Sequence, residues 1–118
     1  MLKANLFDIA VEGEIIFLTP AANLGELENV DASAQEVYDV LADESIKKLV
    51  MDFHKTDSFG STTLGFFVKL WKLMQKRAGR MAFYNLSEHE REILHITKLD
   101  TYWAICESKE EALKAVGN

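Results

Sequence analysis

Residues 49–65 are Leu49-Val50-Met51-Asp52-Phe53-His54-Lys55-Thr56-Asp57-Ser58-Phe59-Gly60-Ser61-Thr62-Thr63-Leu64-Gly65. The first five are mostly apolar and β-prone, which predicts a strand buried in the middle of a sheet. A polar loop over residues 54–60 follows. Ser61 and Thr62 are then suited to cap a long helix that runs to about Ala78, with Gly79 as its stop.

Upstream of this stretch, the sequence predicts a hairpin and a helix. Two apolar runs within residues 6–19 flank Gly13, which favours two antiparallel strands with this glycine at the turn. Pro20 ends the second strand because it has no N–H to donate to a sheet. Asp31 and Ser33 are candidate N-caps for the helix that follows.

Downstream, short apolar runs at residues 81–84 and 102–106 predict two further strands. Ser87 is followed three residues later by Glu90, a capping-box pattern that opens a helix. The same pattern at residues 108–111 predicts a C-terminal helix.

The order of these elements predicts the fold class. Strands that alternate with helices imply right-handed crossovers and an α/β fold with a mostly parallel central sheet. We expect about five strands, with the N-terminal hairpin as an antiparallel edge, and about four helices in one domain over residues 1–118. Functional groups of such sheets tend to lie at the carboxyl ends of strands, which points to residues 54–65.

Composition limits the location and the partners. The net charge of −6 argues against nucleic acid, and the only cysteine, Cys106, favours a reducing compartment. In a strand, this cysteine would be a small buried hydrophobe. The N-terminal residues do not lead into a signal core, and no stretch approaches the roughly 20 apolar residues of a membrane span. We therefore expect a cytoplasmic protein without nucleic-acid or membrane contacts.

One basic cluster has the spacing of a solvated helix stripe. Its members are Lys69, Lys72, Lys76, Arg77 and Arg80.

The sequence contains parts of two functional motifs, a phosphate-binding loop and the nucleophile elbow of hydrolases, but neither motif is complete. Gly60 and Gly65 have the spacing that opens a phosphate-binding loop, but Phe66 and Phe67 stand where Lys and Ser or Thr are required. A nucleophile elbow needs Gly-x-Ser-x-Gly, whereas Ser61 follows Gly60 directly.

The histidines form no catalytic or metal-binding pattern. His54, Asp57 and Ser58 lie so close along one loop that their side chains are not expected to converge as a triad. His89 and His95 are six residues apart and do not share a helix face as metal ligands would. We expect no enzymatic activity, no metal and no cofactor.

Three hydroxyls, Ser61, Thr62 and Thr63, stand at the start of the long helix. Capping of the helix is one explanation, worth about 1 kcal/mol. Phosphorylation is the other, because a helix N-terminus favours a phosphate and a partner docked there would not tolerate it.

The long helix has two apolar stripes. One contains Leu64, Phe67, Trp71 and Met74, and the other contains Phe66, Leu70 and Leu73. The second stripe either widens the core face or forms a patch for a partner.

Residues 49–65 resemble the signature region of STAS domains, in which a buried strand ending in Asp leads through a short loop to an Asp-Ser pair at a helix start. Residues 77–87 are similar to that family's helix end, strand and following loop. Residues 93–100 resemble its next helix and turn, and residues 107–113 its C-terminal helix. The resemblance covers about residues 49–116.

The resemblance implies a role in bacterial partner-switching as an anti-sigma factor antagonist. Such a protein binds an anti-sigma factor that is a serine kinase, is released when the kinase phosphorylates it, and is reset by a phosphatase. The matching acceptor here is Ser61, with Thr62 as an adjacent alternative. Gly60 stands where many members have Asp, so a carboxylate beside the acceptor is missing.

The expected partner-binding residues are those of the loop and the helix start. They are Lys55, Thr56, Asp57, Ser58, Gly60, Ser61, Thr62 and Thr63. Two alternative functions stay open: a STAS scaffold component without phosphorylation, and a module that binds a small molecule such as a nucleotide.

Overall fold

The computed structural model describes residues 6–21, 23 and 27–117. The strands are β1 (Phe7–Glu12), β2 (Ile15–Pro20), β3 (Lys48–Asp52), β4 (Arg80–Tyr84) and β5 (Ala104–Cys106). The helices are α1 (Leu27–Val40), α2 (Ser61–Lys76), α3 (Glu88–Ile96) and α4 (Lys109–Ala115), and a 3₁₀ turn, η1 (Leu99–Thr101), precedes β5.

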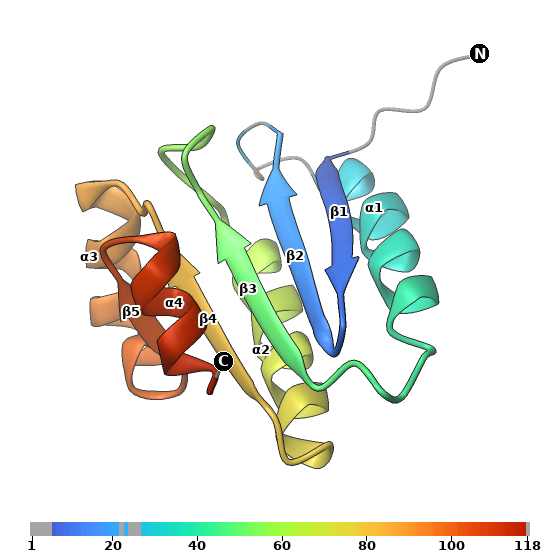
Figure 1. The fold of residues 1–118 in the computed structure, drawn as a ribbon. Helices are drawn as coiled ribbons and strands as arrows, with labels where there is room; N and C mark the ends of the chain where they lie inside the picture. Colours follow the sequence, from blue (N-terminus) through green and yellow to red (C-terminus); the bar gives the residue numbers. More distant parts are fainter. Residues whose placement is uncertain (1–5, 22, 24–26, 118) are drawn as a thin grey trace.

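The five strands form one sheet in the order β1-β2-β3-β4-β5 (Figure 1). β1 and β2 are antiparallel, and the other neighbours are parallel. The predicted α/β fold, with a mostly parallel sheet, an antiparallel N-terminal hairpin and four helices, is confirmed. Parallel pairing brings the carboxyl ends of β2, β3 and β4 to the same edge of the sheet.

Helices cover both faces of the sheet, with α4 on one side and α1 and α2 on the other (Figure 1). The central strand β3 therefore has no solvated face. Leu49 and Met51 belong to the larger core with α2, whereas Val50, which points the other way, packs in a smaller cluster with Ala112 of α4. The predicted burial of this strand in the middle of the sheet is confirmed.

The N-terminal hairpin closes through two residues. Glu12 pairs with Ile15, and Gly13 between them has a φ of 63°, a left-handed conformation that glycine adopts without steric cost. β2 ends at Pro20, as predicted.

Helix α1 begins earlier than the sequence predicted. It starts at Leu27, so Asp31 and Ser33 lie inside the helix and are not its N-caps. The reason is visible in the sequence: Leu27 and Val30 extend the apolar spacing of the helix upstream by a full turn.

Helix α2 ends where expected, for a different reason. The left-handed residue is Ala78, with a φ of 60°, and not Gly79. The Gly79 N–H donates to Met74 O at 2.8 Å, as in a Schellman motif. A Cβ at Gly79 would lie 1.5 Å from the Lys47 carbonyl oxygen, so glycine is needed here for a close approach of two backbones.

The C-terminal third differs from prediction in two details. β5 begins at Ala104, because Tyr102 and Trp103 follow the turn η1 and only Ala104–Cys106 pairs with β4. The capping box of Ser87 and Glu90 is complete, as predicted. At α4, Ser108 caps the helix, but the Glu111 carboxylate accepts from the Glu107 N–H.

The second apolar stripe of α2 widens the core. Phe66 and Leu70 are buried together with Phe67 and Met74 of the first stripe. One member of the predicted basic stripe has a structural role: the Arg77 guanidinium donates to three carbonyl oxygens in the connection after α1, those of Leu41, Asp43 and Ile46.

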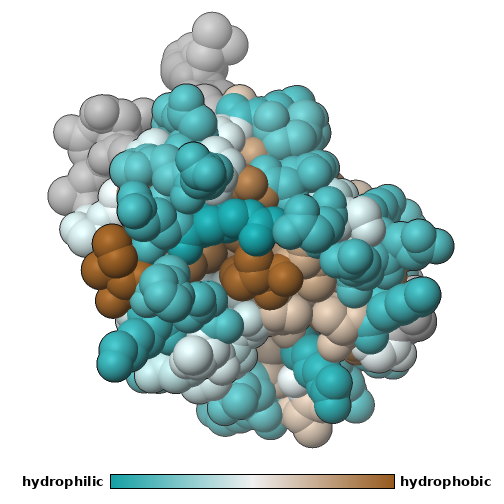
Figure 2. Space-filling model, turned by 90° about the vertical axis from the view of Figure 1, so that its left-hand side faces the viewer, coloured by the Kyte–Doolittle hydropathy of each residue, from teal (hydrophilic) through white to brown (hydrophobic). Residues whose placement is uncertain are grey.

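Figure 2 shows the side of the molecule on which α3 and β5 lie. Polar side chains surround separate apolar patches there. Ile96 is 71% exposed and Tyr102 50% exposed. A single exposed apolar side chain such as Ile96 is normal on a protein surface, whereas Tyr102 stacks on Trp71 with the ring centroids 4.6 Å apart.

Within the described ranges, no helix has both the length and the apolar character that crossing a membrane requires.

Candidate functional site

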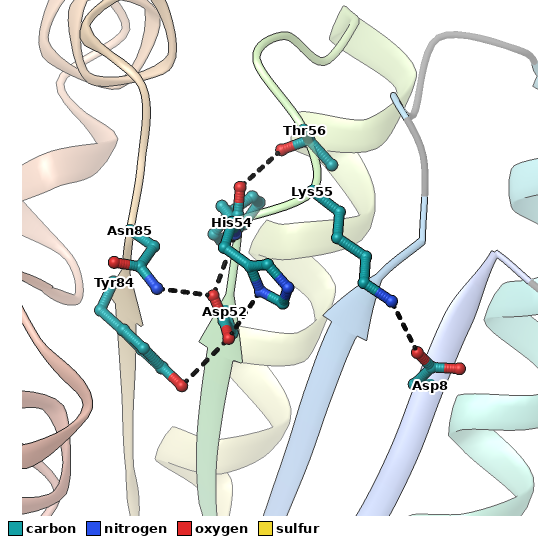
Figure 3. A network of polar contacts seen from close by, with 8 residues as sticks. Asp8, Asp52, His54, Lys55, Thr56, Tyr84 and Asn85 are labelled. Carbon is teal, nitrogen blue, oxygen red and sulfur yellow. Dashed lines mark hydrogen bonds and ion pairs between the residues drawn. The ribbon is translucent and has the colours of Figure 1, made fainter.

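Asp52, the last residue of β3, is the centre of a polar network at the carboxyl edge of the sheet (Figure 3). Its Oδ1 accepts hydrogen bonds from the His54 backbone N–H at 2.9 Å and from Asn85 Nδ2 at 3.0 Å. Its Oδ2 lies 2.9 Å from His54 Nδ1 and accepts the Tyr84 hydroxyl at 3.2 Å. The network joins the start of the β3–α2 loop to the end of β4 and so sets the direction in which the loop leaves the sheet.

The network also shifts the pKa values of Asp52 and Tyr84. Burial disfavours the carboxylate of Asp52, but hydrogen bonds from Asn85 and His54 outweigh it and lower the pKa of this group. Burial, followed by the charge and hydrogen bond of Asp52, raises the pKa of Tyr84 to about 12. At neutral pH the phenol is therefore a donor and the carboxylate an acceptor.

The lowered pKa predicts acid sensitivity. The unfolded chain takes up a proton at Asp52 near pH 3.9, above the folded pKa, so the stabilisation by this group is present at neutral pH and is lost as the pH falls through the folded value. We expect Asp52→Asn to lower the free energy of unfolding at pH 7 and to have a smaller effect near pH 3. Urea unfolding at both values measures this. An equal loss at both pH values would contradict it.

The loop is held a second time through Thr56. Its hydroxyl donates to Glu90 Oε2 at 2.5 Å. The same hydroxyl also lies 3.3 Å from the Phe53 carbonyl oxygen (Figure 3). Glu90 is 0% exposed, and its other oxygen accepts the Ser87 N–H at 2.9 Å. A buried carboxylate is tolerated only when its oxygens are hydrogen-bonded, and here the bonds come from the loop and from the cap of α3.

Asp57 is fixed from two directions. Its N–H donates to Asn23 Oδ1, and its Oδ1 accepts from Asn23 Nδ2, both at 2.9 Å. Its carbonyl oxygen accepts the Ser87 hydroxyl at 2.9 Å. The connections after β2, β3 and β4 therefore meet in this loop.

Lys55 remains at the surface. Its Nζ lies 3.6 Å from Asp8 Oδ2 of β1, and both side chains are largely exposed (Figure 3). Such an ion pair is worth roughly 0–1 kcal/mol, so Lys55 can exchange it for a partner at little cost.

The first turn of α2 follows this loop. Gly60 occupies the N-cap position and offers no side chain, so Ser61 and Thr62 do not cap the helix as predicted. Both are exposed. Thr63 is only 1% exposed, which removes its side chain from the expected partner-binding surface.

The structure brings the remaining expected residues to one end of the molecule. Lys55, Asp57, Ser61 and Thr62 are exposed, and Thr56, Ser58 and Gly60 are partly buried. The Thr56 hydroxyl supports the loop from within through its bond to Glu90.

Several supporting residues were missed from the sequence: Asn23, Asp52, Ser87 and Glu90. The capping-box pattern did identify Ser87 and Glu90, but only as the start of a helix. Their bonds to the loop span 30 and 34 residues, and no local pattern indicates them. The role of Asp52 is easier to predict from the sequence, because an Asp that ends a buried strand must find hydrogen-bond donors.

The described residues do not form the catalytic triad or the metal site that the sequence analysis considered. His54 is bonded to Asp52, and Asp57 to Asn23, so no triad forms with Ser58. His89 and His95 are exposed. Cys106 is buried, as expected for a cysteine in a strand. Across residues 6–21, 23 and 27–117, no group of three His, Cys, Asp or Glu side chains is placed to hold a metal ion.

Solved structures with the same fold include anti-sigma factor antagonists. A protein of Thermotoga maritima, described as a candidate anti-sigma factor antagonist, is 23% identical with a TM-score of 0.85 over 95% of each chain. The antagonist SpoIIAA in its unphosphorylated form is 16% identical with a TM-score of 0.78, over 92% of this chain and 93% of that one. The phosphorylated form of the Bacillus cell fate determinant SpoIIAA is 18% identical with a TM-score of 0.69, over 92% and 96%. At these identities the likeness establishes a common fold.

No curated protein matches the sequence. The profile of the STAS domain, in contrast, matches residues 7–112, which include every strand and the β3–α2 loop. The match therefore covers the region described above as well as the whole sheet. On this ground, the chain belongs to the STAS domain family.

Proposed function

We propose that this STAS domain is an anti-sigma factor antagonist, a binding module that is switched by phosphorylation of Ser61. One observation carries the proposal: Ser61 is an exposed hydroxyl on the first residue of α2, directly after a loop that is fixed by hydrogen bonds to two other connections. A rigid surface of this kind can bind a partner without first being ordered.

The chemistry of the helix start suits such a switch. Gly60 provides no side-chain cap, and the helix dipole is positive at this end. A phosphate on Ser61 would therefore be tolerated by the fold. A partner seated on the same turn would have to desolvate a charge of about −1.5 to −2, so phosphorylation would release it.

The partner of this proposal is an anti-sigma factor that is also a serine kinase, and a phosphatase resets the protein in the cytoplasm. The fold shared with SpoIIAA, which has been solved in an unphosphorylated and a phosphorylated form, supports this scheme. Lys55, Asp57, Ser58 and Thr62 complete the contact surface around Ser61.

We expect Ser61→Ala to abolish phosphorylation and Ser61→Asp to weaken binding of the kinase at least about tenfold, equal to 1.4 kcal/mol. The first variant removes the acceptor, and the second places a carboxylate where the partner must dock. Intact-mass spectrometry after incubation with purified anti-sigma-type kinases of the source organism measures the first effect, and calorimetric titration measures the second.

Thr62→Ala tests the adjacent alternative acceptor and should still gain one phosphate, because the Ser61 hydroxyl remains. A phosphate on Thr62→Ala and also on Ser61→Ala would place the acceptor elsewhere. Binding without any phosphorylation would identify a constitutive binder, which is the expected consequence if Gly60 has disabled kinase recognition. No binding and no modification would favour the scaffold function, and thermal stabilisation by a nucleotide would favour a small-molecule module.

A further inference from the structure

Gly65 lies in the second turn of α2, where a glycine costs about 0.5–1 kcal/mol relative to alanine. The fold itself does not require it. Among the described residues, a Cβ at this position would meet no heavy atom within 4 Å, and its φ is not left-handed. The small residue therefore keeps open a space outside the chain.

That space is part of a groove between α1 and α2. The groove has a volume of about 330 Å³ and is lined by Ala34, Gln35, Tyr38, Thr62, Gly65, Phe66 and Lys69. Thr62 and Gly65 place it one turn from Ser61, because residues three and four apart are neighbours on a helix surface.

One exposed stripe of α2, which we call the α2 stripe, runs past this groove. It consists of Ser61, Gly65, Lys69, Lys72 and Lys76. Helix α2 (Ser61–Lys76) contains no Asp or Glu, although the net charge of the protein is −6. The stripe is therefore a local positive surface on an acidic protein.

We propose that the α2 stripe binds an acidic segment of the partner, and that this segment lies against the helix backbone at Gly65 in the α1–α2 groove. This proposal rests on the function proposed above and specifies the chemistry of the partner. The lysines attract the segment, and the missing Cβ allows it to approach closely.

The same geometry gives a reason for release. Ser61 and Gly65 are four residues apart on one face of α2, so a phosphate on Ser61 lies at the end of the stripe. An acidic segment is repelled by that phosphate in addition to losing its contact with the hydroxyl. A neutral or basic segment would not be repelled.

The test is Gly65→Ala, because its effects on folding and on binding have opposite signs. We expect the melting temperature to rise by about 2–5 °C. We expect the dissociation constant for the purified anti-sigma-type kinase to rise at least about tenfold, since the methyl group occupies the groove. Lys69→Gln with Lys72→Gln should slow association and reduce its dependence on salt. Lys114→Gln, on α4 at the opposite face of the sheet, is the control and should change neither the association rate nor its dependence on salt.

The outcomes separate the two proposals. If the wild type binds no kinase, the proposed function fails, and this inference fails with it. If the wild type binds and Gly65→Ala binds equally well, only the inference is overturned. A lower melting temperature of Gly65→Ala would also overturn it, because glycine would then serve the fold.

Discussion

Replacing Gly79 with alanine is expected to lower the free energy of unfolding by about 3 kcal/mol or more. The added Cβ would lie 1.5 Å from the Lys47 carbonyl oxygen. That oxygen cannot easily yield, because it accepts the Arg80 N–H at 3.2 Å and the Lys47 N–H donates to Glu14 O at 2.9 Å. Relief of the clash would therefore have to move the start of β4 away from the segment before β3. The midpoint of urea unfolding measures the loss.

Ala78→Gly is the matched control, one residue away in the same motif. Ala78 has a φ of 60°, which costs an L-residue about 1–2 kcal/mol and glycine nothing. Part of this gain is offset by the backbone entropy of glycine, so the variant should be about 0.5–1 kcal/mol more stable. A loss below about 1 kcal/mol for Gly79→Ala, or a destabilised Ala78→Gly, would show that the two residues have been assigned the wrong roles.

The second large effect is expected at Glu90. Its substitution by alanine leaves the Ser87 N–H and the Thr56 hydroxyl without their carboxylate acceptor and opens a cavity, which should cost about 2–4 kcal/mol. Because Thr56 belongs to the β3–α2 loop, the amides of residues 55–57 should also exchange hydrogen faster than in the wild type. Urea unfolding and hydrogen exchange measure the two effects.

Glu92→Ala provides the comparison, since Glu92 is exposed on the same helix and its loss should change stability by no more than about 0.5 kcal/mol. Glu90→Gln keeps an acceptor for the Ser87 N–H and should lose less than Glu90→Ala. If Glu90→Ala were as stable as Glu92→Ala, the buried carboxylate would not be holding the loop.

Much of the fold follows from local patterns in the sequence. The apolar run before Asp52 predicts the buried strand, Gly13 predicts the hairpin turn, and Ser87 with Glu90 predicts the start of α3. These patterns are reliable because each reports interactions between residues within a few positions of one another. The same reasoning places the candidate site at the carboxyl end of β3, since parallel strands expose their connections at one edge.

The errors also have a physical reason. Asp31 and Ser33 have the side chains of N-caps but lie inside α1, because apolar spacing over several turns outweighs a single capping preference. Thr63 is chemically similar to Ser61 and Thr62, yet it faces the core, and only the rotation of α2 against the sheet decides that. Gly79 stands after the helix end for a close approach to Lys47, which lies far earlier in the sequence, in the connection before β3.

The sequence alone therefore determined the order and type of the elements and the position of the hydroxyl row, which depend on periodicity and on short-range capping. Only the tertiary structure decided which of those hydroxyls reach the surface and how the loop before them is held. The bonds of Thr56 to Glu90 and of Asn23 to Asp57 each join residues 34 positions apart. Such pairs meet only when β2, β3 and β4 are aligned in one sheet, so the geometry of the site depends on the packing of the whole domain.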